Sequence, residues 1–133
     1  MFASTNHVVI DLETFALTPR ALVRSAALAL FDPWKNDEPT TETYVLDLDA
    51  QQGREISPNT VLWRLRQSES ARRHFVSPFS GGAPGFPHKQ AVSPALFYDR
   101  LTLLRDAVIW AKPSHFDVPI LLSLFAGHIS LEQ

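Results

Sequence analysis

Three acidic side chains, in two short motifs, are the residues of this sequence best suited to chemistry. Asp11 and Glu13 stand two positions apart in VVIDLET. This segment is typical of a strand, and residues i and i+2 of a strand point to the same face. Two adjacent carboxylates repel each other unless a cation lies between them, and hard oxygen ligands suit Mg²⁺ or Mn²⁺. The spacing therefore predicts a carboxylate pair that can hold divalent ions, with Leu12 turned into the core.

Asp117, in SHFDVPILL, is the third acid. It follows the apolar run VIWA and opens an expected helix, a position where sites of α/β sheets often lie. Phosphodiester hydrolysis commonly uses two ions about 3.5–4 Å apart, one activating water and one stabilising the leaving oxygen. Structural alternatives stay open for both motifs. Asp11 and Glu13 could be a solvated pair at a strand edge, and Asp117 could complement the helix dipole.

The elements that must position these acids begin with three strands. Apolar or alternating runs predict strands over residues 7–11, 23–31 and 42–48. Alanines in the second run leave a helix open as an alternative there. The short connections favour an antiparallel meander.

Helices and one further strand follow. The pairs Ser57-Pro58 and Ser93-Pro94 are typical of helix starts. Helices are predicted through residues 59–66 and 69–75, from 94 to about 106, and over 116–125, with Pro119 in the first turn of the last one. A short buried strand is predicted at 108–111, and a Gly-, Pro- and Ser-rich loop at 76–92. This order predicts an α/β fold, a mixed sheet with helices packed on it.

Composition restricts the class of protein. The chain has 133 residues, the size of a single domain, so one domain is expected over 1–133. A content of 45% hydrophobic and 20% charged residues argues against disorder, and the lack of cysteine excludes disulfides and thiolate metal sites. No signal peptide or bilayer-spanning run is evident, so a cytoplasmic location without membrane contact is expected. The net charge of −2 argues against binding of nucleic acid along a broad surface, and favours local contact at a strand terminus or through bound cations.

Three segments together resemble the DnaQ-like, DEDD-type 3′–5′ exonucleases, and within them the phage and prophage group that includes the mycobacterial-type exoribonuclease domain. The first is VVIDLETFALTPRALVRSAALALFDP, in which the matching positions are Asp11, Glu13, Thr14, Pro19, Ala21, Phe31 and Asp32. TVLWRLRQSESAR is similar to a helix of that group, and VIWAKPSHFDVPIL is similar to its second acidic motif.

The resemblance implies both a fold and an activity. The fold would be ribonuclease H-like, with three antiparallel strands and then a parallel one. Asp11, Glu13 and Asp117 would be three of four catalytic acids that hold two Mg²⁺ or Mn²⁺ ions. The backbone around Thr14 and the side chain of Phe15 would lie against the terminal nucleotide. The reaction would release single nucleotides from the 3′ end of RNA or DNA.

The family's third motif, a His or Tyr base followed by a fourth Asp, has no clear counterpart. No Asp follows Asp117, and His128 and Glu132 offer only a weak substitute. A C-terminally truncated domain is therefore expected. It could be a catalytically inactive module that binds nucleic acid or a protein, a fragment, or a chain completed by a partner. Exposed apolar surface would then favour a homodimer or a partner chain.

Other basic and aromatic side chains are expected to be structural. A solvated helical face is favoured over phosphate contacts for a basic cluster made of Arg64, Arg66, Arg72, Arg73 and His74. The tryptophans are expected to pack in or near the core: Trp34, Trp63 and Trp110.

Overall fold

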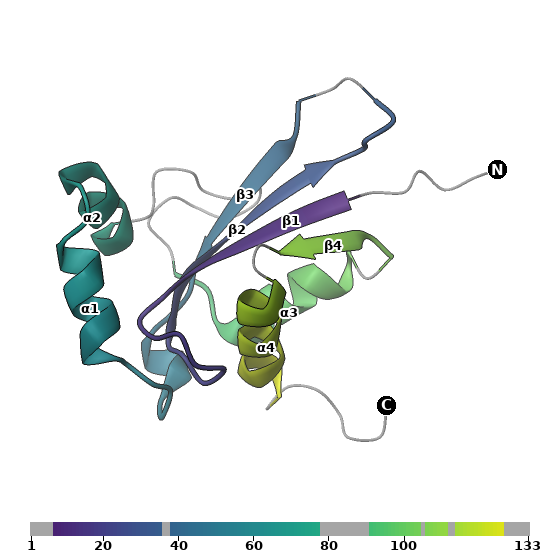
Figure 1. Cartoon of the computed structure of the whole chain (residues 1–133). Coiled ribbons are helices and arrows are strands. Elements are labelled where there is room, and N and C mark those ends of the chain that lie inside the picture. Colours follow the sequence, from purple (N-terminus) through teal and green to yellow (C-terminus); the bar gives the residue numbers. More distant parts are fainter. Residues whose placement is uncertain (1–6, 36–37, 78–90, 105, 112–113, 127–133) are drawn as a thin grey trace.

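The computed structural model describes residues 7–35, 38–77, 91–104, 106–111 and 114–126. Its strands form one sheet in the order β3-β2-β1-β4 (Figure 1). β1 (His7–Thr14), β2 (Val23–Phe31) and β3 (Thr40–Val45) pair antiparallel in succession, and β4 (Val108–Ala111) pairs parallel with β1. The predicted mixed sheet, three antiparallel strands and then a parallel one, is confirmed.

The helices lie beside one end of the sheet and over one of its faces (Figure 1). They are the 3₁₀ helix η1 (Asp49–Gln51), α1 (Pro58–Leu65), α2 (Glu69–Val76), α3 (Pro94–Thr102) and α4 (Ser114–Phe125). The hydroxyls of Ser57 and Ser93 accept N–H groups of the first turns of α1 and α3, so both predicted caps are confirmed.

Several predicted boundaries are wrong by a few residues. β1 runs on through Thr14, and β3 covers Thr40–Val45 instead of 42–48. α3 ends at Thr102, before the predicted 106, because turns follow it. α4 begins two residues earlier than predicted, which places Pro119 inside the helix and not in its first turn. Most of the predicted loop 76–92 lies outside the described residues, as do His128 and Glu132.

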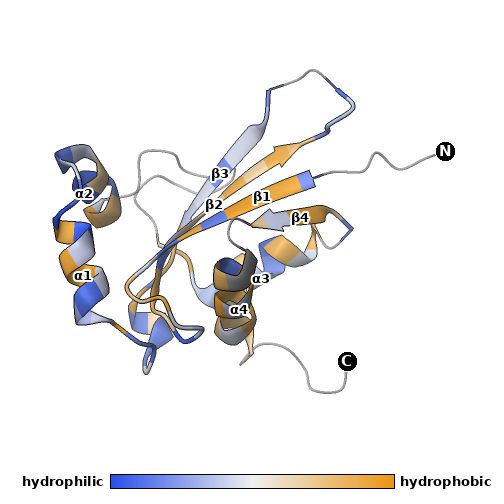
Figure 2. Ribbon diagram, viewed as in Figure 1, coloured by the Kyte–Doolittle hydropathy of each residue, from blue (hydrophilic) through white to orange (hydrophobic). Residues whose placement is uncertain are grey.

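The core lies on the sheet face covered by α3 and α4. Alternate residues of β1 point into it, and Val8, Ile10 and Leu12 are at most 4% exposed. Phe97 of α3 and Ile120 of α4 belong to the same buried cluster. Figure 2 shows hydrophobic residues along β1, β2 and α4. This packing fixes the start of α4, and with it Asp117, against the end of β1.

β4 is exposed, so the prediction of a buried strand at 108–111 is wrong. Val108, Ile109 and Trp110 are 40%, 50% and 54% exposed. In the described part of the chain β4 is an edge strand paired only with β1. Val108 and Trp110 also pair with residues on the side of β1 that faces away from the core.

The expected packing of the tryptophans in or near the core is wrong as well. Trp34, in the turn that follows β2, is 86% exposed, and Trp63 of α1 is 53% exposed. No helix in the described ranges is long and apolar enough to cross a membrane. The expected homodimer or partner chain stays a prediction.

Candidate active site

The C-terminal end of β1 carries the first two acids. Asp11 is exposed and Glu13 is half-buried, whereas the alternate residues Leu12 and Thr14 are buried. The pairing with β2 shifts at this point: Glu13 lies opposite Ser25, but Thr14 lies opposite Val23. Bulges of this kind often occur beside active sites, where they re-aim a side chain. The predicted common direction of Asp11 and Glu13, with Leu12 in the core, agrees with this alternation.

The bulge is held by two polar side chains. The buried Gln51 amide donates to the Val23 carbonyl (2.8 Å) and accepts the Val23 N–H (2.9 Å), as a neighbouring strand would. The Arg24 guanidinium donates to the carbonyls of Phe75 (2.9 Å) and Val76 (2.6 Å) at the end of α2. The end of β1 is therefore tied to the helices beside it.

Asp117 reaches the same place from the start of α4. It is 2% exposed, and within the described structure its Oδ2 atom has no hydrogen-bond partner. Burial raises the pKa of Asp117 to about 6, and the negative charges of Asp11 and Glu13 contribute to this rise. Loss of surrounding water and the charge of Glu13 also raise the pKa of Asp11, against the lowering effect of Arg64. The three carboxyl groups therefore act on one another as neighbours.

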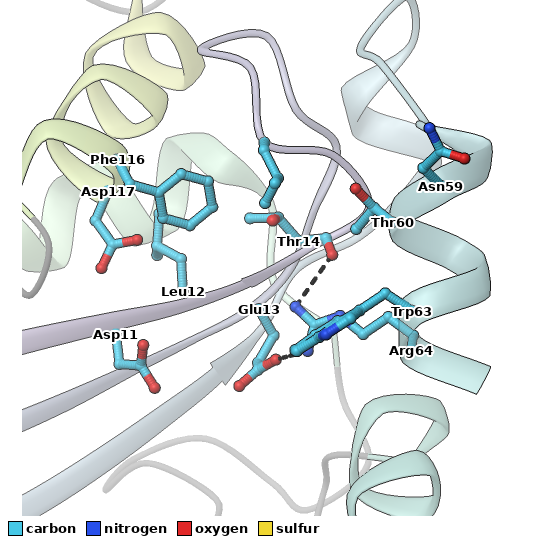
Figure 3. A pocket seen from close by; sticks show the side chains of 11 residues that line it. Asp11, Leu12, Glu13, Thr14, Asn59, Thr60, Trp63, Arg64, Phe116 and Asp117 are labelled. Carbon is cyan, nitrogen blue, oxygen red and sulfur yellow. Dashed lines mark hydrogen bonds and ion pairs between the residues drawn. The ribbon is translucent and has the colours of Figure 1, made fainter. Parts of the chain in front are cut away.

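This environment fits a divalent cation at Asp11 and Asp117. A buried carboxylate that faces other carboxylates without a hydrogen-bond donor is costly, and a bound cation reverses that cost. Glu13, by contrast, is directed at Arg64, with which it forms an ion pair (Figure 3). Over the described ranges, no three His, Cys, Asp or Glu side chains are arranged to hold an ion. The full three-acid set would thus require Glu13 to turn.

A cavity of about 500 Å³ opens beside the acids. Its apolar walls come from Leu17, Trp63 and Phe116, and Asn59 and Thr60 add polar groups. In Figure 3 the Asp11 and Asp117 carboxylates lie on one side of this space, and Asn59 lies on the other. Sites for small molecules have this size and this mixture of apolar walls and few polar groups.

Of the two residues predicted to lie against the terminal nucleotide, Thr14 lines the cavity and Phe15 does not. Thr14 lines the cavity, and its hydroxyl donates to the Ala16 carbonyl (2.7 Å). Phe15 does not line the cavity, because its ring packs edge-on against Phe75, with 4.9 Å between the ring centroids. The role of Phe15 against a terminal nucleotide stays a prediction.

Sequence reasoning missed the contribution of α1 to the site. Arg64 lines the cavity and pairs with Glu13, so the expected solvated position is wrong for this arginine. The other members of the basic cluster are exposed: Arg66, Arg72, Arg73 and His74. Helical spacing would have indicated the shared face, since Thr60 and Arg64 are four residues apart, with Trp63 three residues from Thr60.

The sheet order and strand directions are those of a ribonuclease H-like fold. Residues 6–131 match the family model of the 3′-5′ exoribonuclease Rv2179c-like domain. The chain belongs to this family. No curated protein matches the sequence.

Solved structures of exonuclease I share the fold. The apo enzyme superimposes with a TM-score of 0.60 at 18% identity, over 93% of this chain and 25% of the other. A product-bound structure gives the same TM-score and identity, over 93% and 26% of the two chains. The Escherichia coli enzyme in complex with a dA16 oligonucleotide gives a TM-score of 0.55 at 19% identity, over 92% and 24%. The chain thus spans about a quarter of the length of these enzymes.

Proposed function

We propose that this domain is a 3′–5′ exonuclease that hydrolyses phosphodiester bonds at the 3′ ends of RNA or DNA, with two Mg²⁺ or Mn²⁺ ions at Asp11, Glu13 and Asp117. The observation that carries the proposal is the buried Asp117 carboxylate, which lies beside Asp11 at the edge of the cavity of about 500 Å³. None of the described residues donates a hydrogen bond to its Oδ2 atom. Membership of an exoribonuclease family supports the reaction, and favours RNA as the first substrate to test.

Each side of the cavity has a distinct task in this reaction. Asp11 and Asp117 would hold the cations, and Glu13 would have to leave Arg64 to become a third ligand. Bound there, the ions would activate water and neutralise the charge that develops on the scissile phosphate. The exposed indole of Trp63 offers a face on which a base can stack, because base–aromatic stacking tolerates any base.

A second candidate is a non-catalytic module of the same fold that binds nucleic acid or a protein. The Glu13–Arg64 ion pair favours it, because this contact occupies one of the three acids. A module that has no catalytic role has no need of two ions, so the stoichiometry of Mn²⁺ binding separates the two candidates.

The test is degradation of 5′-labelled single-stranded RNA and DNA with Mg²⁺ or Mn²⁺. Wild type is expected to give a ladder that shortens from the 3′ end. Asp11→Asn and Asp117→Asn are each expected to lower the rate at least about 100-fold, since even partners outside the ligand set cost 10–100-fold when lost. Asp99→Asn is the matched control, because Asp99 is exposed on α3 and does not line the cavity.

Isothermal titration with Mn²⁺ on the same proteins decides the other outcomes. Two bound ions together with a ladder support the enzyme. A folded wild type that binds RNA but cleaves neither substrate supports the module. A folded wild type that binds neither Mn²⁺ nor nucleic acid contradicts both candidates.

A further inference from the structure

Arg64 makes more contacts with the acidic site than a surface arginine does. Its guanidinium forms an ion pair with Glu13, and its Nη2 atom donates to the Thr14 carbonyl (3.2 Å). The Arg64 side chain is only 19% exposed. Its Nε atom is buried and, among the described residues, has no hydrogen-bond partner. The side chain is therefore a component of the site wall and not a solvated charge.

Two aromatic rings hold the guanidinium in place. Its central carbon lies 5.1 Å from the centroid of the Trp63 ring and 4.5 Å from that of the Phe75 ring. Phe75 is itself fixed, because its ring packs on Phe15 and its carbonyl accepts a hydrogen bond from Arg24. Cation–π contacts of this kind strengthen when the cation is partly desolvated. Arg64 is consequently a fixed positive charge beside the three acids.

Glu13 cannot serve this fixed charge and a metal ion at Asp11 and Asp117 equally well. One oxygen of its carboxylate is paired with Arg64 (Figure 3). A charge-assisted hydrogen bond of this type is about twice as strong as a neutral one. Moving Glu13 to an ion requires that this bond be broken, while the contacts of Arg64 with Thr14 and with the rings need not change.

We propose that Arg64 is a positioning residue that holds Glu13 in the ion-free protein and releases it when a divalent cation binds at Asp11 and Asp117. Arg64 thereby weakens ion binding, and the three-acid set forms only when the ion arrives. This inference rests on the proposed function, since it needs a cation at these acids. A purely structural Arg64 would anchor α1 to β1 and would have no reason to oppose the ion.

The test is a double-mutant cycle in Mn²⁺ affinity, measured by isothermal titration without nucleic acid. The proteins are wild type, Arg64→Met, Glu13→Gln and the double variant. Methionine keeps an unbranched apolar stem between the rings but removes the charge. We expect Arg64→Met to lower the Mn²⁺ Kd about tenfold, the order of one charged hydrogen bond. In the Glu13→Gln background the same substitution is expected to change Kd less than about threefold, because the competing carboxylate is gone.

Arg66→Met is the matched control, because Arg66 is the C-cap residue of α1, is exposed and does not line the cavity. It is expected to leave Kd unchanged. If Arg64→Met does not give the wild-type circular dichroism spectrum, Arg64→Lys replaces it in the cycle. Lysine keeps the charge but cannot reach Glu13 and Thr14 with one planar group, so a smaller tightening, about threefold, is expected.

Two results overturn the inference while the proposed function stands. In the first, wild type binds Mn²⁺, but substitution of Arg64 leaves the Kd unchanged or raises it. The other is equal tightening in the wild-type and Glu13→Gln backgrounds, which indicates repulsion through space and no competition for Glu13. A wild type that binds no Mn²⁺ at millimolar concentration overturns the inference and the proposed function together.

Discussion

At the scale of single residues, Asp117 is a buried carboxyl group whose Oδ2 atom accepts no hydrogen bond from the described part of the chain. Its neighbours Asp11 and Glu13 are negative, and Arg64 interacts with Glu13 instead. In the absence of an ion, burial and repulsion therefore oppose folding whenever Asp117 is ionised. Retaining such a group makes sense where a cation supplies the missing charge.

Asp117→Asn is accordingly expected to stabilise the ion-free protein. Its pKa of about 6 means that wild type carries the full penalty at pH 8. We expect the free energy of unfolding to rise by about 1–2 kcal/mol, because asparagine removes the charge but stays polar. The measurement is urea denaturation at pH 8 in EDTA, with Asp99→Asn as control, expected within about 0.5 kcal/mol of wild type. A loss of stability in Asp117→Asn would show that the carboxylate is satisfied in solution.

The acids of the site could be predicted from sequence, but their partners could not. The spacing of Asp11 and Glu13 settles their common face through the period of a strand, which is a local property. The pairing of Glu13 with Arg64 depends on where α1 lies relative to β1, and no local pattern contains that information. Trp63 is predicted to lie in the core for a similar reason. Its hydrophobicity is a local property, but the cavity that it lines is formed by the tertiary structure.

At the scale of elements, Gln51 replaces a strand partner at the β2 bulge. We expect Gln51→Ala to lower the free energy of unfolding by about 2 kcal/mol, because the N–H and carbonyl of Val23 lose their buried partners. Chemical denaturation measures this. Gln52→Ala is the matched control, because Gln52 is the next residue along the chain and its side chain is exposed. Equal stability of the two variants would mean that water satisfies Val23 equally well.

A buried polar network joins β3 to α3. Glu42, 3% exposed, forms an ion pair with Arg100 and accepts the hydroxyl of Tyr44. Burial alone would raise the pKa of Glu42, but the hydrogen bonds from Arg100 and Tyr44 outweigh it and lower the pKa. This network stabilises the fold only while Glu42 is ionised.

Its pH dependence follows from the sign of that shift. A carboxyl group with a lowered folded-state pKa stabilises the protein above its unfolded pKa, here 4.5, and the stabilisation is lost as pH falls through the folded value. Glu42→Gln is expected to cost about 2–3 kcal/mol at pH 7, where it leaves Arg100 unpaired. Denaturant titrations from pH 7 to pH 3 should show wild type approaching the variant. Glu69→Gln, in the exposed Glu69–Arg73 pair, should stay within about 0.5 kcal/mol of wild type throughout.

The elements themselves were predictable where local chemistry decides them. Ser57-Pro58 and Ser93-Pro94 marked helix starts because the hydroxyl cap and the proline act within one turn. The apolar run VIWA predicts a buried strand, but the exposure of β4 depends on its position at the sheet edge. Sequence hydrophobicity reports what can be buried, and topology decides what is.

At the scale of the whole molecule, the site joins two segments from opposite ends of the described chain. Asp11 and Glu13 come from the first strand and Asp117 from the last helix, and the hydrophobic core brings the two together. An ion that contacts both segments binds the folded chain and not the unfolded one. Ion binding and global stability are therefore linked.

Mn²⁺ at 100 times its Kd is thus expected to raise the free energy of unfolding of wild type by about 2.7 kcal/mol. For a domain of this size that corresponds to a rise in Tm of roughly 5–15 °C. Hydrogen exchange should slow in α4 as well as in β1, because the ion ties the helix start to the strand. Asp117→Asn should lose both effects, and Asp99→Asn should keep them.

Asp117→Asn is also expected to be more stable than wild type without ions. The Tm of wild type should therefore lie below that of Asp117→Asn in EDTA and above it once Mn²⁺ is added. A general salt effect would shift both Tm values together, so an unchanged order would contradict a cation site that spans β1 and α4.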